Sequence, residues 1–231
     1  MRVTADVKEA TRKRILDASQ KLFARQGFEA TTTRDIARAA NIAVGTLFNY
    51  FPTKESVVDF WVSHALLSGA EAFASGLNRD DAGNSEAIEN AAQEAEPSSL
   101  EEDLFSYLAV LLRKLRPYRK YLPAVLETSL STLGASSDAD KPTLRDSQIE
   151  TIYQIASRHG LQEALSTVAI QLYWTLFTGI LAFWAKDRSP RQEDTLALVD
   201  QSLFMFVGWL IDSTSSEPTG QRQTKSSRNE R

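Results

Sequence analysis

The sequence predicts an all-α protein in which a three-helix head with a helix-turn-helix pattern is joined by a long helix to an all-helical body. Apolar residues recur at helical spacing along most of the chain, as Ile15, Leu22 and Phe23 do near its start. No run of alternating β-branched residues between turn residues indicates a sheet. At 231 residues, the chain is long enough for a small head and a larger body.

The first two helices of the head have clear end signals. A helix over about residues 8–26 is followed by Gly27, which suits a helix C-cap. Thr32 stands three residues before Asp35, and a capping threonine with an acid in the first turn predicts a second helix over about 33–40.

A turn and a short third helix follow. Asn41 occupies the turn, where a residue that tolerates positive φ is needed. A short helix is expected over 44–50 and a long one over about 53–77. The small side chains of Ala37 and Ala40 would let the second and third helices cross closely, which completes a helix-turn-helix.

The body is expected to contain helices separated by polar loops. Residues 78–99 are rich in Gly, Asn, Ser and acids, which is typical of a loop. Ser99 followed by Glu102 predicts a capping box at the start of a helix that ends near Arg116. A shorter helix ending near Thr132 is expected before the loop GASSDADKP. Further helices are predicted over 143–159, 161–186 and 192–212, with a disordered tail over 213–231.

Residue content argues against several kinds of chemistry. The chain has no cysteine and only two histidines, so we expect neither thiol chemistry nor a histidine metal cluster. Tyr107, Tyr153 and His159 fall in no nucleophile, phosphate-loop or metal spacing, so no enzyme, cofactor or metal site is predicted. His159 is interpreted instead as a residue at a helix C-terminus, where a cation suits the dipole.

The sequence also predicts a place and a kind of partner. We find no segment that is apolar over the ~20 residues of a membrane span and no signal peptide, so a cytoplasmic protein is expected. Residues 1–60 hold ten Lys and Arg against seven Asp and Glu, whereas the remainder holds sixteen against twenty-three. A mildly basic head on an acidic body suggests that a polyanion would bind the head, although an ordinary solvated surface fits the charges equally well.

The short third helix carries side chains suited to DNA. Gly45 would let the backbone approach base edges, and Thr46 offers a hydroxyl and a methyl group. Asn49 can bond an adenine edge or a phosphate, and Tyr50 can bond a phosphate oxygen. Lys54 lies in the first turn of the next helix, where free N–H groups and an ammonium would bind a phosphate together.

The stretch TRKRILDASQKLFARQGFEATTTRDIARAANIAVGTLFNYFPTKESV, residues 11–57, resembles the DNA-binding domain of the TetR family of bacterial transcriptional repressors. The resemblance implies a DNA-binding domain over 8–68, in which Arg34 reaches a guanine and Thr33 binds phosphate. Phe48 stands where the family commonly has Tyr, and Ala43 stands where a Ser often caps the helix. The predicted DNA contacts are Thr33, Arg34, Val44, Gly45, Thr46, Phe48, Asn49, Tyr50 and Lys54.

For the body, over 69–212, the resemblance implies a homodimer with a small-molecule pocket and a bundle of the last two helices. A 3-4-3-4 spacing along the last helix and a small-residue face on the helix before it fit that interface, although both also fit packing within one protomer. The predicted interface is Thr175, Gly179, Ala182, Leu196, Val199, Leu203, Phe206 and Leu210. The predicted pocket is Phe105, Leu108, Leu112, Tyr153, Trp174 and Phe177.

The sequence therefore predicts a dimeric repressor released from a palindromic operator by a small-molecule effector. The acidic, aromatic-rich body favours an apolar or cationic aromatic compound slightly, and Trp174 is expected to offer an aromatic face that can hold a cation. An alternative is a DNA-binding regulator controlled by a protein partner. A structural DNA-binding protein without an effector is disfavoured, because its body would be basic.

Overall fold

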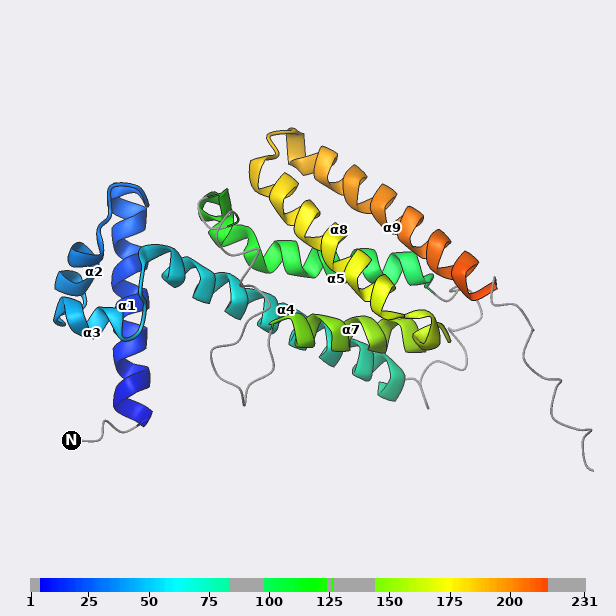
Figure 1. Ribbon diagram of the computed structural model, residues 1–231, viewed down its shortest axis with the longest axis horizontal. Helices are drawn as coiled ribbons and strands as arrows, with labels where there is room; N and C mark the ends of the chain where they lie inside the picture. Colours follow the sequence, from blue (N-terminus) through cyan, green and yellow to red (C-terminus); the bar gives the residue numbers. More distant parts are fainter. Residues whose placement is uncertain (1–4, 84–97, 124–125, 127–143, 216–231) are drawn as a thin grey trace, which may run out of the picture.

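The computed structural model describes residues 5–83, 98–123, 126 and 144–215, and every regular element within these residues is a helix (Figure 1). This confirms the predicted all-α fold. The predicted helix end near Thr132, the loop GASSDADKP and most of the predicted tail lie outside the described residues.

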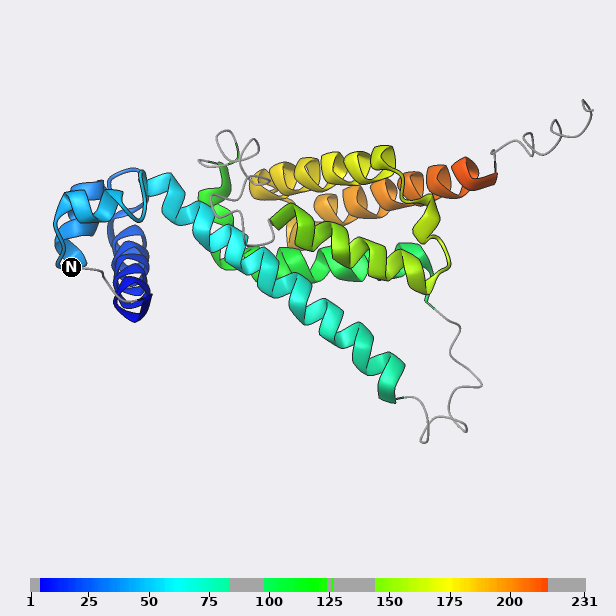
Figure 2. The same ribbon diagram turned by 60° about the horizontal axis from the view of Figure 1, so that its bottom comes forward.

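The head consists of α1 (Ala5–Gln26), α2 (Thr33–Ala39) and α3 (Val44–Phe48). It lies at one end of the molecule, and α4 leads from it along the body (Figures 1 and 2). The predicted cap of α2 is a full capping box: the Thr32 hydroxyl accepts from the Asp35 N–H, and the Asp35 carboxylate accepts from the Thr32 N–H. The Thr32 hydroxyl also donates to the Asp35 carboxylate at 2.6 Å. This hydrogen bond, followed by the one from the Thr32 N–H, lowers the pKa of Asp35.

Helix α4 (Lys54–Gly83) is longer than the sequence indicated and joins head to body. It packs against α5 (Leu100–Leu115) and α7 (Leu144–Arg158). Gly69 marks the crossing with α5, because a Cβ built there would lie 2.8 Å from the Leu111 Cδ2 atom. The absence of a side chain therefore sets how closely the two helices approach.

A 3₁₀ segment, η1 (Arg116–Tyr121), follows α5 directly, and the chain ends in the antiparallel pair α8 (Thr167–Lys186) and α9 (Glu193–Ser215). This pair covers the side of the body opposite α4 (Figure 2). The helix predicted from residue 161 begins later, because Ser166 caps α8 by accepting from the Ala169 N–H. The residues before it form η2 (Gln162–Ala164), and η3 (Pro190–Gln192) joins α8 to α9.

Two stretches, α8 and residues 190–214, are long and apolar enough by length and composition to cross a membrane, which corrects the expectation that the chain has no such segment. Both helices have one face in the core of the body, where Phe177, Leu181 and Leu210 are buried. Their apolar character therefore arises partly from protomer packing and partly from a second, exposed apolar face described below.

Candidate DNA-binding interface and effector site

Helix α3 is fixed to the head by its inner face and leaves its outer face accessible. Leu47 is buried, and Asn41 has a φ of 53° in the turn before the helix. That left-handed conformation is tolerated better by Asn than by most other residues. Ala43 occupies the N-cap and provides no side-chain hydrogen bond, in agreement with the lost cap that the sequence indicated.

The predicted DNA contacts form a mixed surface on α2 and α3. Thr33, Val44, Thr46 and Tyr50 are half-buried at its edge, whereas the exposed members are Arg34, Gly45, Phe48 and Asn49. A Cβ built on Gly45 would meet nothing within 4 Å. The protein's own packing therefore gives no reason for a glycine at that position, which leaves open space for an external partner.

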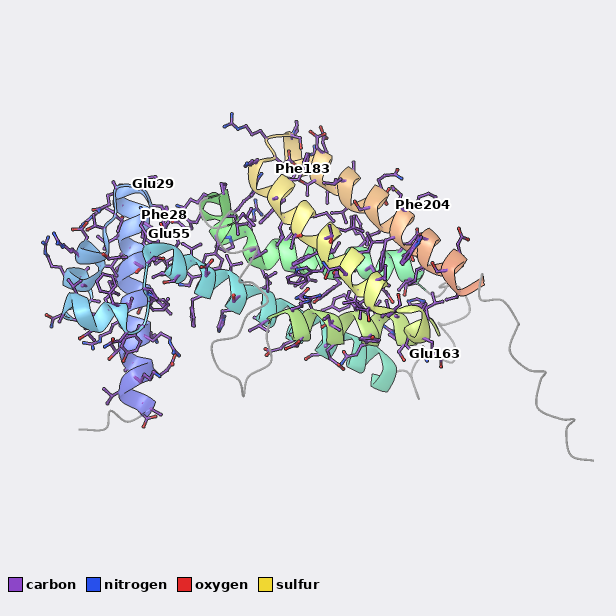
Figure 3. All side chains as sticks on the ribbon, viewed as in Figure 1. Phe28, Glu29, Glu55, Glu163, Phe183 and Phe204 are labelled. Atoms are coloured by element: carbon purple, nitrogen blue, oxygen red, sulfur yellow. The ribbon has the colours of Figure 1, made fainter. Side chains whose placement is uncertain are left out.

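Lys54 has a structural contact that the sequence did not indicate. Its Nζ donates to the carbonyl oxygens of Phe28 at 3.0 Å and Glu29 at 3.3 Å, and it lies 4.4 Å from the centre of the Phe28 ring. Figure 3 shows Phe28 and Glu29 beside the start of α4. The Glu29 carboxylate also lies 3.7 Å from this Nζ atom, so a phosphate would compete with it for the third donor of the ammonium. The phosphate contact stays a prediction.

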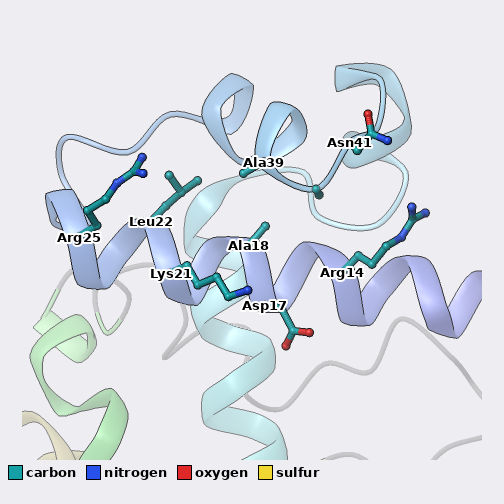
Figure 4. Close-up of a pocket in the computed structure, with 9 residues that line it drawn as sticks. Arg14, Asp17, Ala18, Lys21, Leu22, Arg25, Ala39 and Asn41 are labelled. Carbon is teal, nitrogen blue, oxygen red and sulfur yellow. The ribbon is translucent and has the colours of Figure 1, made fainter.

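A shallow groove runs along the head between α1 and the α2–α3 turn (Figure 4). Arg14, Lys21 and Arg25 line it from α1 together with Asp17, and Asn41 lines it from the turn. The three cations give this side of the head a positive balance, which would favour a polyanion close to α3.

An aromatic cluster joins the head to η1 of the body. Tyr118 stacks on Trp61 with ring centres 5.7 Å apart, and the Tyr121 ring lies 5.6 Å from Phe23 and 6.0 Å from Phe28. Tyr121 is buried by these contacts. A displacement of η1 would therefore move side chains in the core of the head.

Arg119 connects the same 3₁₀ segment to the corner between α8 and α9. Its Nε donates to the Trp184 carbonyl at 2.8 Å, and a second guanidinium nitrogen donates to the Asp187 carbonyl. The Asp187 carboxylate in turn accepts from the N–H groups of Ser189 and Thr195 and from both their hydroxyls. These hydrogen bonds hold the pKa of Asp187 well below its ordinary value.

The residues of the predicted pocket do not converge on one space. Leu108, Leu112 and Phe177 are buried in the core, whereas Phe105 lines a surface groove beside Leu203. The remaining two have protein partners: the Tyr153 hydroxyl donates to the Leu165 carbonyl at 3.1 Å, and the Arg145 guanidinium lies 5.8 Å from the Trp174 ring. A cation supplied by the protein therefore occupies the aromatic face on which the sequence placed a ligand.

The structure reveals a buried polar cluster that the sequence did not single out. Tyr107 on α5, Gln148 on α7 and Tyr173 on α8 are at most 4% exposed. Within the described residues, the buried side-chain atoms that lack a hydrogen-bond partner are the two hydroxyls of these tyrosines and both amide atoms of the glutamine. The available signal was Tyr107 on the apolar face of its helix, between Leu104 and Leu111.

The predicted dimer residues divide between two environments. On α9, Val199, Leu203, Phe206 and Leu210 are buried within the protomer, which leaves Leu196 as the exposed member of the seam. On α8, Thr175 and Gly179 are exposed and Ala182 is half-buried. The 3-4-3-4 seam thus packs on the body's own core, as the alternative interpretation of the spacing allowed.

A second apolar face lies on the outer side of α8 and α9, opposite α4. Figure 3 shows Phe183 and Phe204 on this side of the body. The large apolar side chains exposed on the two helices are Val168, Phe183, Leu196, Phe204, Met205, Trp209 and Ile211. We call the surface around Phe183 and Phe204 the α8–α9 outer face. The small residues Thr175 and Gly179 are exposed on the same helix pair.

Fold and head together define an all-helical DNA-binding regulator of transcription. Residues 15–59 match the family described as "Bacterial regulatory proteins, tetR family", and residues 104–217 match the "Tetracyclin repressor-like, C-terminal domain". The chain belongs to the TetR family. Members of this family are transcriptional regulators rather than enzymes, which confirms that an enzyme was not to be expected.

Curated relatives match over a short stretch of the chain. The chain is 50% identical over 52 residues to the transcriptional repressor KstR2 of Rhodococcus jostii, which covers 22% of this chain and 26% of that protein. It is 44% identical over 52 residues to the repressor KstR of the same organism, over 22% of this chain and 24% of the relative. The chain therefore matches about a quarter of the length of these relatives.

Solved structures are similar over nearly the whole chain. The repressor FadR of Thermus thermophilus, crystallised with lauroyl-CoA, is 22% identical, with 92% of this chain and 100% of that chain covered and a TM-score of 0.56. A TetR regulator from Rhodococcus sp. RHA1 is 18% identical, with coverages of 87% and 97% and a TM-score of 0.54. At these identities the likeness shows a shared fold.

Proposed function

We propose that the protein is a homodimeric repressor whose two α3 helices bind a palindromic operator and that a small molecule bound in the body releases it. The observation that carries the proposal is the outer surface of α2 and α3, where Gly45 faces open space and Asn49 and Arg34 are exposed. The roles of KstR2 and FadR as repressors support it. We retain the division into a head over 8–68 and a body over 69–212, and the cytoplasm as its location.

Two routes connect the body to the head in this proposal. Helix α4 runs from the phosphate-binding lysine into the body, where Phe73 packs against Tyr107 with ring centres 5.0 Å apart. The second route is η1, whose Tyr121 contacts the head and whose Arg119 binds the α8–α9 corner. A ligand that binds one arrangement of these elements more tightly would shift the spacing of the two heads.

Selection from random DNA tests the operator. Two inverted half-sites are expected, and log affinity should fall with log salt by about 0.9 per neutralised phosphate. Recovery of one asymmetric site, or a flat salt response, would contradict the proposal.

A matched pair of substitutions on α2 tests base reading. Arg34→Ala should lose roughly 1–3 kcal/mol, concentrated at one base position, because Arg34 is proposed to bind a guanine. Arg38→Ala removes the same charge from the same helix, where Arg38 lies 3.8 Å from Asp35. Equal losses by both variants at all positions would show that only the charge matters.

A further inference from the structure

The polar cluster of Tyr107, Gln148 and Tyr173 stands in an apolar part of the body. Ile152 of α7 and Phe177 of α8 are buried nearby, and the Tyr173 ring stacks on Phe177 at 6.3 Å and lies 6.0 Å from Phe206. Leaving a buried donor or acceptor unpaired costs roughly 1–3 kcal/mol per group. Such groups are rare in folded proteins, and pairing with a water, an ion or a ligand is one reason that they are retained.

None of the three side chains satisfies the others. The Tyr107 hydroxyl lies near Gln148 and Thr151, and these neighbours oppose the rise that burial causes in its pKa, but neither contact has hydrogen-bond geometry. The Thr151 hydroxyl donates instead to the Ser147 carbonyl at 3.0 Å. Burial raises the pKa of both tyrosines, so both hydroxyls stay protonated at neutral pH and able to donate.

A small, partly open space adjoins the cluster between α7 and α8. It is lined by Gln148, Ile149, Ile152, Ile170, Tyr173 and Trp174, so no charged residue is among its described lining. Its volume of about 10 Å³ is close to that of one water molecule. Ile149, Ile170 and Trp174 are only half-buried, and outward rotation of these side chains would open the space to solvent.

We propose that this space is the closed form of the effector site and that its ligand is an uncharged, mainly apolar molecule with a carbonyl or hydroxyl group that pairs with Tyr107, Gln148 and Tyr173. The inference deepens the proposed ligand-responsive function and rests on it. A charged ligand would lose its hydration at this cluster without gaining an opposite charge among the lining residues. A carbonyl oxygen instead accepts from the tyrosine hydroxyls and the amide N–H, and the apolar remainder replaces Trp174 against the isoleucines.

The substitutions that test the site keep side-chain shape while they remove polarity. Tyr173→Phe and Gln148→Leu should unfold at the same temperature as wild type or a few degrees higher, because unpaired polar atoms are removed. Tyr153→Phe is the matched control on α7: it breaks a satisfied hydrogen bond, so its Tm should fall by about 2–4 °C. If Tyr173→Phe loses as much as Tyr153→Phe, the cluster holds a structural water and the proposal is overturned.

Binding is then measured on the protein without DNA. The probes are three neutral ketones (octan-2-one, cyclohexyl methyl ketone and acetophenone), with octanoate, cyclohexanecarboxylate and benzoate as anionic counterparts and octylammonium as a cation. At least one ketone should raise the wild-type Tm by about 5–10 °C at one hundred times its Kd. Tyr173→Phe and Gln148→Leu should bind it about 10-fold more weakly, whereas Tyr153→Phe should bind it unchanged.

Several results would overturn the assignment. These are no shift with any ketone, tighter binding of the charged probes, or equal ketone affinity in wild type and both cluster variants. Operator binding is assayed separately in the same samples. A chain that binds a ketone but no DNA would refute the proposed repressor function and support the proposed ligand class. A chain that binds DNA but no ketone would refute the proposed ligand class and leave the proposed DNA binding intact.

Discussion

We propose that the α8–α9 outer face is the surface through which two copies of the chain pair. Phe204→Ala is therefore expected to weaken their association without loss of protomer stability. Phe204 is 63% exposed at the α8–α9 outer face, so about two thirds of its side chain remains to be covered. Fully burying a phenylalanine is worth about 1.5–3 kcal/mol, which leaves about 1–2 kcal/mol for each copy. Two-fold symmetry doubles this to about 2–4 kcal/mol, or a Kd about 30- to 700-fold higher.

The neighbouring residue provides the contrast. Leu203 is 3% exposed and points into the protomer, so Leu203→Ala should cost about 2–5 kcal/mol of folding free energy. For a chain of this size, that loss lowers the Tm by about 4–20 °C. Val7→Ala, at a 54% exposed position on α1, should alter neither quantity.

Sedimentation over a range of concentrations measures the Kd, and thermal unfolding at concentrations where every variant is monomeric measures protomer stability. A Phe204→Ala protein that dimerises as tightly as wild type would refute the outer-face interface. A Leu203→Ala protein that is monomeric without a lower Tm would show that the dimer interface includes the 3-4-3-4 seam of α9.

Three further outcomes are expected. Gly45→Ala should fold as well as wild type or slightly better but bind the operator more weakly, because its new methyl group would separate α3 from DNA. Gly76→Ala, at a second helical glycine in open space, should bind the operator normally. Equal operator binding by both variants would contradict a close approach of α3 to DNA. Gly69→Ala should lose about 1–2 kcal/mol in denaturant unfolding, because its Cβ would overlap the fully buried Leu111, and a gain in stability would show that α4 and α5 part freely. The pKa of Asp187 is lower in the folded state than in the unfolded state, so its ionised carboxylate stabilises the fold above about pH 4 and this stability is lost as pH falls. Asp187→Asn should therefore flatten the acid side of a plot of Tm against pH. An unchanged acid side would show that Asp187 does not contribute to acid sensitivity.

Local signals in the sequence were sufficient for most helix boundaries in the head. An N-cap at Thr32 and a capping box at Ser99 were predicted, and both positions form capping boxes, because each is made within four consecutive residues. The positive φ of Asn41 followed from the same kind of local constraint. Helix α8 was misplaced at its start because Ser166, its actual cap, lay inside a stretch of apparently continuous helical periodicity.

Periodicity along α9 could show that one face is apolar but not which molecule covers it. Leu203 and Phe206 have the spacing of a helix-pairing seam, and packing against the protomer's own α5 satisfies that spacing as well as a second copy would. The exposed Phe204 and Met205 stand beside them in sequence on another side of the helix. Only the placement of α9 on the body decided which face is covered.

The sequence by itself determined the helical fold, the helix-turn-helix and the family, because these depend on residues close together in the chain. The tertiary structure decided the candidate effector site, because Tyr107, Gln148 and Tyr173 come from three helices. Their polar atoms are buried without hydrogen-bond partners only when those helices pack together. It likewise gave Lys54 its bonds to the carbonyls of Phe28 and Glu29, more than twenty residues earlier. Hydrogen-bond satisfaction is a property of the folded surroundings, so no spacing of residues along the chain reveals it.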